Sequence, residues 1–380
     1  MELVAARLAR STATRDRPPR VRRLPCTLLL SVLLIGCAGS AAPTPRSVAV
    51  PVAPDQQHPA LSPVALPRDD APHRALTEWW YFTGHLTAGD RPFGFEFVIF
   101  QSERRDAPRL YASHFAITDM RTGTFAYAER TALRPHGGDP ETLDLAVDTW
   151  TLNGGDGRFR IRARMEAHAL DVDLVATRPP ILHGGTGIIS FGPAGDSYYY
   201  SYTRLAATGV LAMAEGDLPV SGLVWMDHQW GDFISAGGGW DWFALHLDGG
   251  LDATFSRVFD EKGDTTLRYG SLLDDLGRTT HLSAERFRID SLATWTSPHS
   301  GATYPARWRV SVPEEGLDLT IEPVLADQEL DTRASTGVTY WEGAVLARGS
   351  RWGAPISGQG YVELNGYATT LVGDKRGGAR

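Results

Sequence analysis

Cysteine is almost absent from this 380-residue chain: Cys26 and Cys37 are its two copies, and both lie near the N-terminus. The rest of the sequence therefore excludes a disulfide framework, a thiolate metal site and a cysteine nucleophile. The G-x-S-x-G and H-E-x-x-H signatures of serine hydrolases and zinc proteases are missing as well. The glycine runs at residues 184–185 and 237–239 have no phosphate-binding lysine, so they indicate turns or hinges. These absences predict no cofactor.

Positive charge is also scarce. The formal net charge is −8, and residues 1–36 hold seven of the 37 Lys and Arg residues but two of the 45 acidic ones. The chain that remains after removal of these residues is therefore more acidic still. An acidic surface repels phosphate backbones and anionic lipid head groups, which argues against a nucleic-acid partner.

The N-terminal region has the pattern of an export signal. Basic residues precede an apolar run at residues 24–36, which is too short to span a bilayer. The run ends Leu34-Ile35-Gly36-Cys37, which resembles a bacterial lipobox, in which the cysteine is lipidated. We therefore predict a lipoprotein signal peptide over residues 1–36 and an exported, envelope protein anchored to the membrane through lipidated Cys37; an ordinary secretory signal is the alternative. Residues 37–74, rich in Pro and Ala, predict a disordered tether.

The remaining pattern is one of short alternating strands separated by Gly and Asp turns, without a long helical period. Residues 93–101 (FGFEFVIFQ), 159–165 (FRIRARM) and 169–176 (ALDVDLVA) alternate apolar and polar side chains. This spacing predicts an all-β fold of two tandem antiparallel β-barrels, one over residues 75–236 and one over residues 237–372.

Residues 221–243 (SGLVWMDHQWGDFISAGGGWDWF) concentrate the candidate chemistry, with four of the eleven Trp residues, three Asp and one His. Because strand residues alternate between faces, His228 and Trp230 should point together and Asp227 away from them. In the next strand Trp242 should share a face with Trp240, and Asp241 should lie on the other. We expect this stretch to end one barrel and begin the other.

A carboxyl group in an aromatic, apolar setting has a raised pKa and suits general acid catalysis, and Trp faces stabilise a carbocation. The candidate catalytic residues are Asp227, His228, Trp230 and Asp241. The candidate ligand-binding residues are Glu78, Trp80, Tyr81, Glu96, Trp240 and Trp242. Barrel closure is the alternative role, with buried Trp rings, His228 bonded to a carbonyl and Asp241 bridging the hinge. The residues that could hold a metal ion are Asp227, His228, Asp232, Asp241 and His246, but their spacing does not converge, so no metal is predicted.

Several motifs in order resemble one family. They are EWWYFTGHL (residues 78–86), RPFGFEFVIF (91–100), SHFAITD (113–119), YYYSYTR (198–204), WMDHQWGD (225–232), GWDWFALHLDGG (239–250), YWEGAV (340–345) and GYVELNGY (360–367). Together they resemble the AttH-type secreted "predicted hydrolases", which are relatives of carotenoid 1,2-hydratase, the hydroxyneurosporene synthases. The resemblance implies two tandem lipocalin-like barrels.

The resemblance also implies activity. The hydratases add water across a double bond by acid catalysis, and their D-H-x-W-G motif matches residues 227–231, which implies roles for His228 and Trp230. A Tyr and an Asp on the strand after the W-D-W motif supply the proton in that pattern; here that strand (LDATFSRVFD, residues 251–260) has Phe255, Ser256 and Arg257 at its centre and Asp252 near its start. We expect a lipoprotein that binds a long apolar isoprenoid or acyl lipid in a Trp-lined cavity, with acid-catalysed hydration or hydrolysis. The alternative is a non-catalytic lipid carrier or accessory lipoprotein that partners an ABC export permease.

Overall fold

The computed structural model describes residues 62–103, 108–133, 142–233 and 238–368. These residues belong to one compact unit, His58–Arg380. The predicted signal peptide, Cys37, the tether up to residue 61 and the hinge around residues 236–237 lie outside the described residues. Within the described residues, no helix has the length and apolar character needed to cross a membrane.

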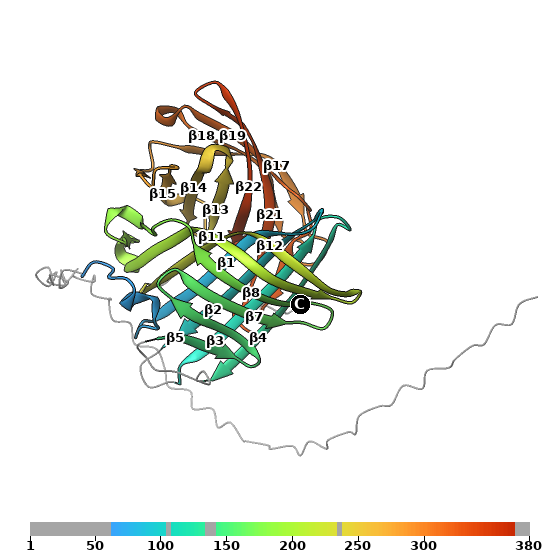
Figure 1. The fold of residues 1–380 in the computed structure, drawn as a ribbon. Coiled ribbons are helices and arrows are strands. Elements are labelled where there is room, and N and C mark those ends of the chain that lie inside the picture. The colour runs from blue at the N-terminus through green and yellow to red at the C-terminus, as the bar shows by residue number, and fades with distance from the viewer. Residues whose placement is uncertain (1–61, 104–107, 134–141, 234–237, 369–380) are drawn as a thin grey trace, which may run out of the picture. The chain divides into compact units, whose positions relative to one another are not determined.

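Twelve antiparallel strands form the first sheet, in the order β4-β3-β2-β1-β12-β11-β8-β7-β6-β5, with β9 and β10 also paired to β11 (Figure 1). They are β1 (Thr77–Ala88), β2 (Arg91–Ser102), β3 (Leu110–Asp119), β4 (Thr124–Leu133), β5 (Leu143–Val147), β6 (Trp150–Gly155), β7 (Arg158–Arg164), β8 (Ala169–Ala176), β9 (Ile181–Leu182), β10 (Ile188–Ser190), β11 (Asp196–Met213) and β12 (Gly216–Gly231).

Ten strands, coloured yellow to red in Figure 1, form the second sheet in the order β16-β15-β14-β13-β22-β21-β19-β18-β17, with β20 paired to β21. They are β13 (Gly239–Leu247), β14 (Leu251–Phe259), β15 (Thr265–Leu273), β16 (Thr279–Leu282), β17 (Arg288–Thr296), β18 (Thr303–Val312), β19 (Leu317–Pro323), β20 (Glu329–Thr332), β21 (Val338–Arg351) and β22 (Ala354–Asn365).

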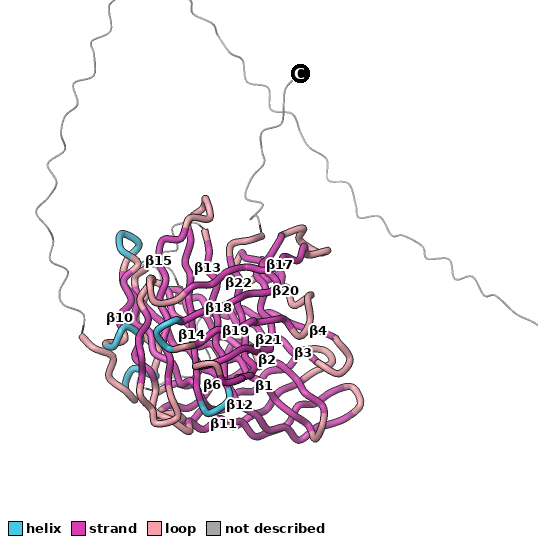
Figure 2. The backbone as a smooth tube through the Cα atoms, turned by 90° about the horizontal axis from the view of Figure 1, so that it is seen from above, coloured by secondary structure: helices cyan, strands magenta, loops and turns pink. Residues whose placement is uncertain are grey.

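The helices of the described residues are single 3₁₀ turns, drawn cyan in Figure 2 among the magenta strands. They are η1 (Arg68–Asp70), η2 (His183–Gly185), η3 (Gly192–Ala194), η4 (Asp248–Gly250) and η5 (Pro313–Glu315). Two large barrel-like antiparallel sheets with no α-helix among the described residues confirm the predicted all-β, lipocalin-like fold class.

Alternation along each strand decides which side chains enter which core. Trp80 and Phe82 of β1 and Met226 of β12 lie in the core of the first sheet. Phe243 and Leu245 of β13 lie in the core of the second. Each core is filled by large apolar side chains, as expected for a small barrel whose interior is packed.

The other faces of the same strands meet between the two sheets. Tyr81, Trp225, Trp242 and Tyr361 belong to one buried cluster drawn from both sheets. Gly94 of β2 permits this close approach, because a Cβ atom at that position would overlap the Tyr361 hydroxyl. The strands on either side of the Gly-rich stretch therefore each present one face to a barrel core and the other to the interface.

A buried ion pair also joins the sheets. Asp252 of β14 is fully buried and accepts hydrogen bonds from Arg204 at 2.5 Å and from Thr203 at 2.9 Å, both on β11. Arg178 lies 3.3 Å from the same carboxylate. Asp252, the acid at the start of this strand, is therefore held by cations of the first sheet.

Residues 62–74, which the sequence assigned to the tether, pack on the first sheet. Asp69, Asp70 and Ala71 are buried there, and the Asp70 carboxylate accepts a hydrogen bond from the Tyr200 hydroxyl at 2.5 Å. Val64 of this segment also lies in the core of the first sheet. Composition gave no sign of this packing, because isolated apolar and acidic residues without periodicity do not mark a packed segment.

Candidate active site

A cavity of about 450 Å³ lies between the two sheets. Aromatic rings dominate its wall, among them Trp79, Tyr81 and Phe100 from the first sheet and Trp240 and Trp242 from the second. Cavities of this size with apolar walls and few polar groups are typical of small-molecule sites.

Two carboxyl groups face this cavity. They are Asp227 of β12 and Glu363 of β22, and the described residues that line the cavity include no Lys or Arg. His114 also lines it, but burial lowers the pKa of its imidazole to about 3, so that ring is neutral. The cavity therefore combines an apolar wall with two acids that have no neighbouring cation.

Three donors hold the Asp227 carboxylate. Tyr199 donates a hydrogen bond to Oδ2 at 2.5 Å, while Trp225 Nε1 at 2.6 Å and the Ser201 hydroxyl both donate to Oδ1. Trp242 Nε1 in turn donates to the Tyr199 hydroxyl at 3.1 Å. Trp242 also acts on the Asp227 carboxyl as a hydrogen-bond donor, so this carboxyl lines the cavity within a ring of donors.

Burial and hydrogen bonding act in opposite directions on Asp227. Burial raises the pKa of its carboxyl, the bonds from Ser201, Tyr199 and Trp225 lower it, and the result is a pKa of about 6. A carboxyl with a pKa near neutral exchanges its proton readily, which is the property required of a general acid or base.

Behind Ser201 lies a buried imidazole. His183 Nε2 is 2.7 Å from the Ser201 oxygen, and its ring stacks on Tyr199 with centroids 3.8 Å apart. His183 therefore contacts two of the groups that donate to Asp227, and its burial lowers the pKa of the ring to about 3.

Glu363 is the second carboxyl of the cavity. Burial raises its pKa to about 7, against hydrogen bonds from Trp240 and Asn365. Like Asp227, Glu363 can therefore exchange its proton near neutral pH. Two such carboxyls can serve one proton-transfer reaction, one as the donor and the other as the acceptor.

Two further acids lie fully buried on the same faces, next to the cavity. Glu96 of β2 has no hydrogen-bond partner for either carboxyl oxygen, and Glu342 of β21 accepts one bond, from the Tyr81 hydroxyl at 2.7 Å. Burial, then the proximity of Glu363, holds the pKa of both carboxyls well above the usual range. The neutral, protonated form of both carboxyls is therefore favoured over the ionised form.

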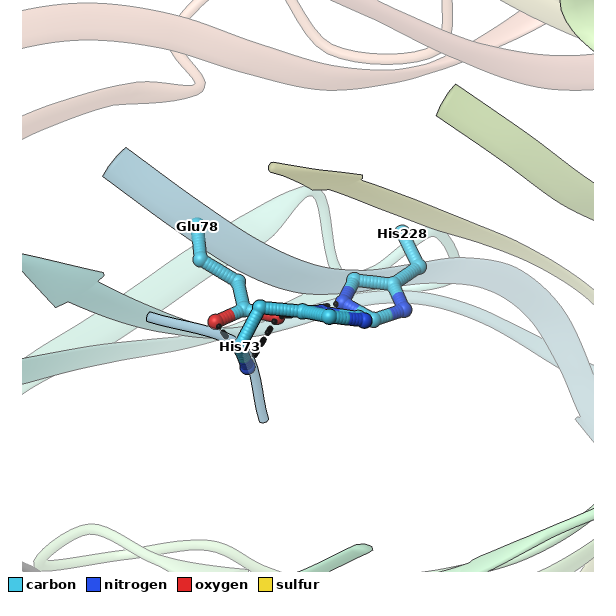
Figure 3. Close-up of side chains that lie close together, drawn as sticks. All are labelled: His73, Glu78 and His228. Carbon is cyan, nitrogen blue, oxygen red and sulfur yellow. Dashed lines mark hydrogen bonds and ion pairs between the residues drawn. The ribbon is translucent and has the colours of Figure 1, made fainter. Parts of the chain in front are cut away.

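His228 lies on the opposite face of β12, inside the first sheet. Its Nε2 is 2.9 Å from Glu78 Oε1 and its Nδ1 is 3.1 Å from the Tyr200 hydroxyl. Figure 3 shows the rings of His73 and His228 converging on the Glu78 carboxylate. His73 contributes a 2.7 Å contact from Nδ1 to Oε1 and a 2.9 Å bond from its backbone N–H to Oε2.

This network is closed and saturated. The Glu78 carboxylate also accepts a bond from Gln101 at 2.8 Å, and both ring nitrogens of His228 have partners. Trp80 and Trp230 stack around the His228 ring at centroid distances of 4.7 and 4.6 Å. Burial lowers the pKa of His228, against the bond to Glu78. None of Glu78, His228 and Trp230 lines the cavity described above.

His73, Glu78 and His228 are, within the described part of the chain, the group whose ligand atoms are close enough for a metal ion, all within 4.8 Å of one another. Two imidazoles and a carboxylate suit zinc or non-haem iron. Here the same atoms satisfy one another through hydrogen bonds, so the arrangement is complete as a polar network. The five residues considered from sequence do not form such a group.

The structure thus divides the predicted residues between three places. Tyr81, Asp227, Trp240 and Trp242 line the cavity, and Glu96 lies buried beside it. Glu78, Trp80, His228 and Trp230 lie in the first core or its polar network. Asp241 is in neither place.

Asp241 faces the interior of the second sheet. Its carboxylate accepts one hydrogen bond from Arg257 at 3.0 Å and another from the Tyr367 hydroxyl at 2.6 Å. Burial raises the pKa of this carboxyl, and both partners oppose the rise. An acid already paired with a guanidinium is a poor proton donor. Asp241 is therefore less suited to acid catalysis than Asp227, which has no such partner.

Sequence reasoning did not single out Glu363, Glu342, Tyr199 or Ser201. All four belong to motifs quoted above, GYVELNGY, YWEGAV and YYYSYTR. The signal that was available is the acid at an apolar-flanked strand position, which marks Glu342 and Glu363 in the same way as it marks Glu96.

Comparison with known proteins now places the chain. The model of the AttH-like family matches residues 57–367. The chain belongs to the AttH-like family. The crystal structure of an AttH protein from Nitrosomonas europaea is 31% identical, with a TM-score of 0.74, over 82% of this chain and 98% of the other.

Two more distant relatives carry named activities. Kievitone hydratase from Nectria haematococca shares the fold, with a TM-score of 0.67 at 19% identity over 82% of this chain and 95% of that chain. Dehydratase asqC from Emericella nidulans is 23% identical over 216 residues, which are 54% of this chain. The match spans 60% of that relative's length, less than two thirds of it.

Proposed function

We propose that the chain is a hydro-lyase, which adds water to or removes water from a carbon–carbon bond of an apolar ligand bound between the two sheets. The observation that carries this proposal is the presence of both Asp227 and Glu363 on a mainly apolar, aromatic cavity wall. Hydration and dehydration each move one proton to the ligand and one away from it. One protonated and one ionised carboxyl can supply the donor and the acceptor for these two transfers.

In dehydration, the ionised Asp227 takes the proton from a carbon next to the one that carries the hydroxyl. The C–H electron pair becomes the double bond, the C–O bond breaks, and protonated Glu363 donates its proton to the departing hydroxyl, which leaves as water. In hydration, the carboxyls exchange these roles. Trp240 and Trp242, which lie on the same wall, stabilise positive charge that develops on the carbon skeleton.

Two lines of comparison support the reaction class. The family match covers most of the chain, residues 57–367, and two relatives bear the names hydratase and dehydratase. The substrate of neither relative is carried over, because the cavity walls are specific to each chain.

We further propose that the ligand is a long apolar molecule such as an isoprenoid or acyl lipid, and that the chain is exported and anchored through Cys37. The supporting observations are the aromatic cavity wall and the lipobox-like residues 34–37. The alternative is a non-catalytic lipid carrier, whose cavity binds the ligand without converting it. For this alternative the proposed partner is an ABC export permease.

The test is a labelled-water assay. The purified full chain is incubated with an apolar extract in water enriched in heavy oxygen, and mass spectrometry follows compounds that gain or lose one water. The proposal expects such compounds with the native chain, and their loss in Asp227→Asn and Glu363→Gln but not in Asp217→Asn, an exposed acid on the same strand β12. An extracted ligand that binds but never changes mass would favour the carrier.

A further inference from the structure

The proton transfer described above leaves two buried acids without a role. Glu342 lies directly opposite Glu363 on the neighbouring strands β21 and β22. Directly opposed residues of an antiparallel pair have Cβ atoms roughly 4.5–5.5 Å apart on the same face, and like charges there repel. The two carboxyls therefore cannot both ionise unless a positive charge joins them.

Glu96 adds a third carboxyl to this group. It extends from β2 on the face that also carries Val98 and Phe100, both of which line the cavity. Glu96 is fully buried, and neither of its oxygens has a partner. A buried polar group that is left unpaired costs stability, roughly 1–3 kcal/mol, so its presence requires an explanation.

The surroundings supply rings but no counter-charge. No Lys or Arg is found among the described residues that line the cavity, and His114 is neutral. Trp242 pairs directly with Glu363 across β13 and β22, and Trp240 pairs with Asn365 further along the same strands. Aromatic faces combined with carboxylates are the combination that binds quaternary and protonated amines.

We propose that the part of the cavity at Glu363, Trp240 and Trp242, with Glu96 and Glu342 buried beside it, binds an ammonium group of the ligand. The substrate class is then an apolar, unsaturated compound that carries a basic nitrogen. The ammonium balances the charge of one ionised carboxyl in the opposed pair, so that the other can keep its proton, and it lies against the rings. The claim that such a compound is the substrate rests on the proposed function. The claim that the site binds an ammonium group does not.

The spacing favours an organic cation over a metal ion. Among the described residues, the metal-sized group of ligands is His73, Glu78 and His228, and the three glutamates do not form one. Carboxyls too far apart to share one small ion can still surround an ammonium group with its alkyl substituents.

The test uses two isosteric probes, phenyltrimethylammonium and tert-butylbenzene, which differ in the charge of one central atom. Binding to the full chain is measured by calorimetry at pH 8. The inference expects the cation to bind at least about tenfold tighter than the neutral isostere, in line with the cation–π and charge-pair terms. Glu363→Gln and Glu342→Gln should reduce that preference to within about twofold, whereas Glu322→Gln, an exposed acid on β19, should leave it intact.

The inference would be overturned if the two probes bound equally, if the neutral probe bound more tightly, or if neither bound. Equal binding is the result expected if Glu342 and Glu363 share a proton instead of pairing with a cation. The labelled-water assay separates this result from a failure of the proposed function. Cation preference without turnover leaves the inference standing and removes the hydro-lyase, and turnover of neutral compounds without cation preference does the reverse.

Discussion

Strands β1 and β12 present two polar sites on their two faces, and the sites differ in how fully their hydrogen bonds are satisfied. On the inner face, His228 and Glu78 are enclosed by Trp rings, and each polar atom has a partner. On the outer face, Asp227 lines a cavity, and on the neighbouring strand β2 the oxygens of Glu96 are unpartnered.

This difference in hydrogen bonding suggests a structural role for the inner site and a chemical role for the outer one. A saturated buried network fixes one conformation and offers no group to a substrate. A carboxyl with a raised pKa beside an aromatic cavity has both a proton to exchange and space for a ligand. In the D-H-x-W-G motif, His228 and Trp230 belong to the interior of the first sheet, and Asp227 is the residue for which we propose the catalytic role.

The largest expected effect is on turnover by Asp227→Asn. The amide cannot accept the substrate proton, and general acid–base groups contribute roughly 10²–10⁴-fold, so the labelled-water rate should fall by about a thousandfold. Circular dichroism and urea unfolding should show a folded protein, because the amide oxygen of the variant still accepts from Ser201 and Trp225. Residual activity within tenfold of the native rate would remove Asp227 from the mechanism.

The next effect is on stability and concerns the opposite face. His228→Ala takes one partner from the buried Glu78 carboxylate and opens space between Trp80 and Trp230, so the free energy of unfolding should fall by about 3–5 kcal/mol. Turnover per folded molecule should stay within about threefold. His73→Ala is the matched control: its half-buried ring bonds the same carboxylate, and the loss should be smaller. A stable but inactive His228→Ala protein would contradict this account.

The smallest effect is a pH dependence of stability. Asp227, Glu363, Glu96 and Glu342 all have raised pKa values, so the folded chain binds their protons more tightly than the unfolded chain does. Their contribution is complete below the unfolded values near pH 4 and is lost as the pH rises through the folded values, about 6 for Asp227 and about 7 for Glu363. These four carboxyls should therefore lower the free energy of unfolding between pH 5 and pH 8. The buried imidazoles of His114 and His183, whose pKa values are lowered, act in the opposite direction as the pH rises to about 6.5.

Glu96→Gln sharpens that prediction. Because glutamine does not ionise, the variant should gain about 1–3 kcal/mol relative to the native chain at pH 8 and little at pH 5, as measured by urea unfolding. Asp173→Asn, at an exposed position on β8, should change neither value. A gain from Glu96→Gln that is the same at pH 5 and pH 8 would contradict a raised pKa for this carboxyl.

Local periodicity was sufficient for part of this picture. Alternation correctly separated Asp227 from His228 and Asp241 from Trp242, because the period of a strand is fixed by its backbone. It could not say which face a second sheet would cover, since that depends on pairings between residues more than a hundred positions apart, such as Tyr81 with Glu342.

The same limit explains the residues that were missed. Glu363 and Glu342 become a pair through the register of β21 and β22, which the sequence of either strand alone does not reveal. Strand β14 contributes Ser256 and Val258 to the cavity wall but no acid, and Asp252 at the start of that strand forms an ion pair with Arg204. The second carboxyl of the cavity comes from β22 instead.

The most direct test is an experimental structure of the full chain with phenyltrimethylammonium or with the ligand recovered from the extract. The account predicts the ligand between the sheets, in contact with Asp227, Trp242 and Glu363. A ligand bound inside the first barrel, against His228 and Trp230, would contradict it.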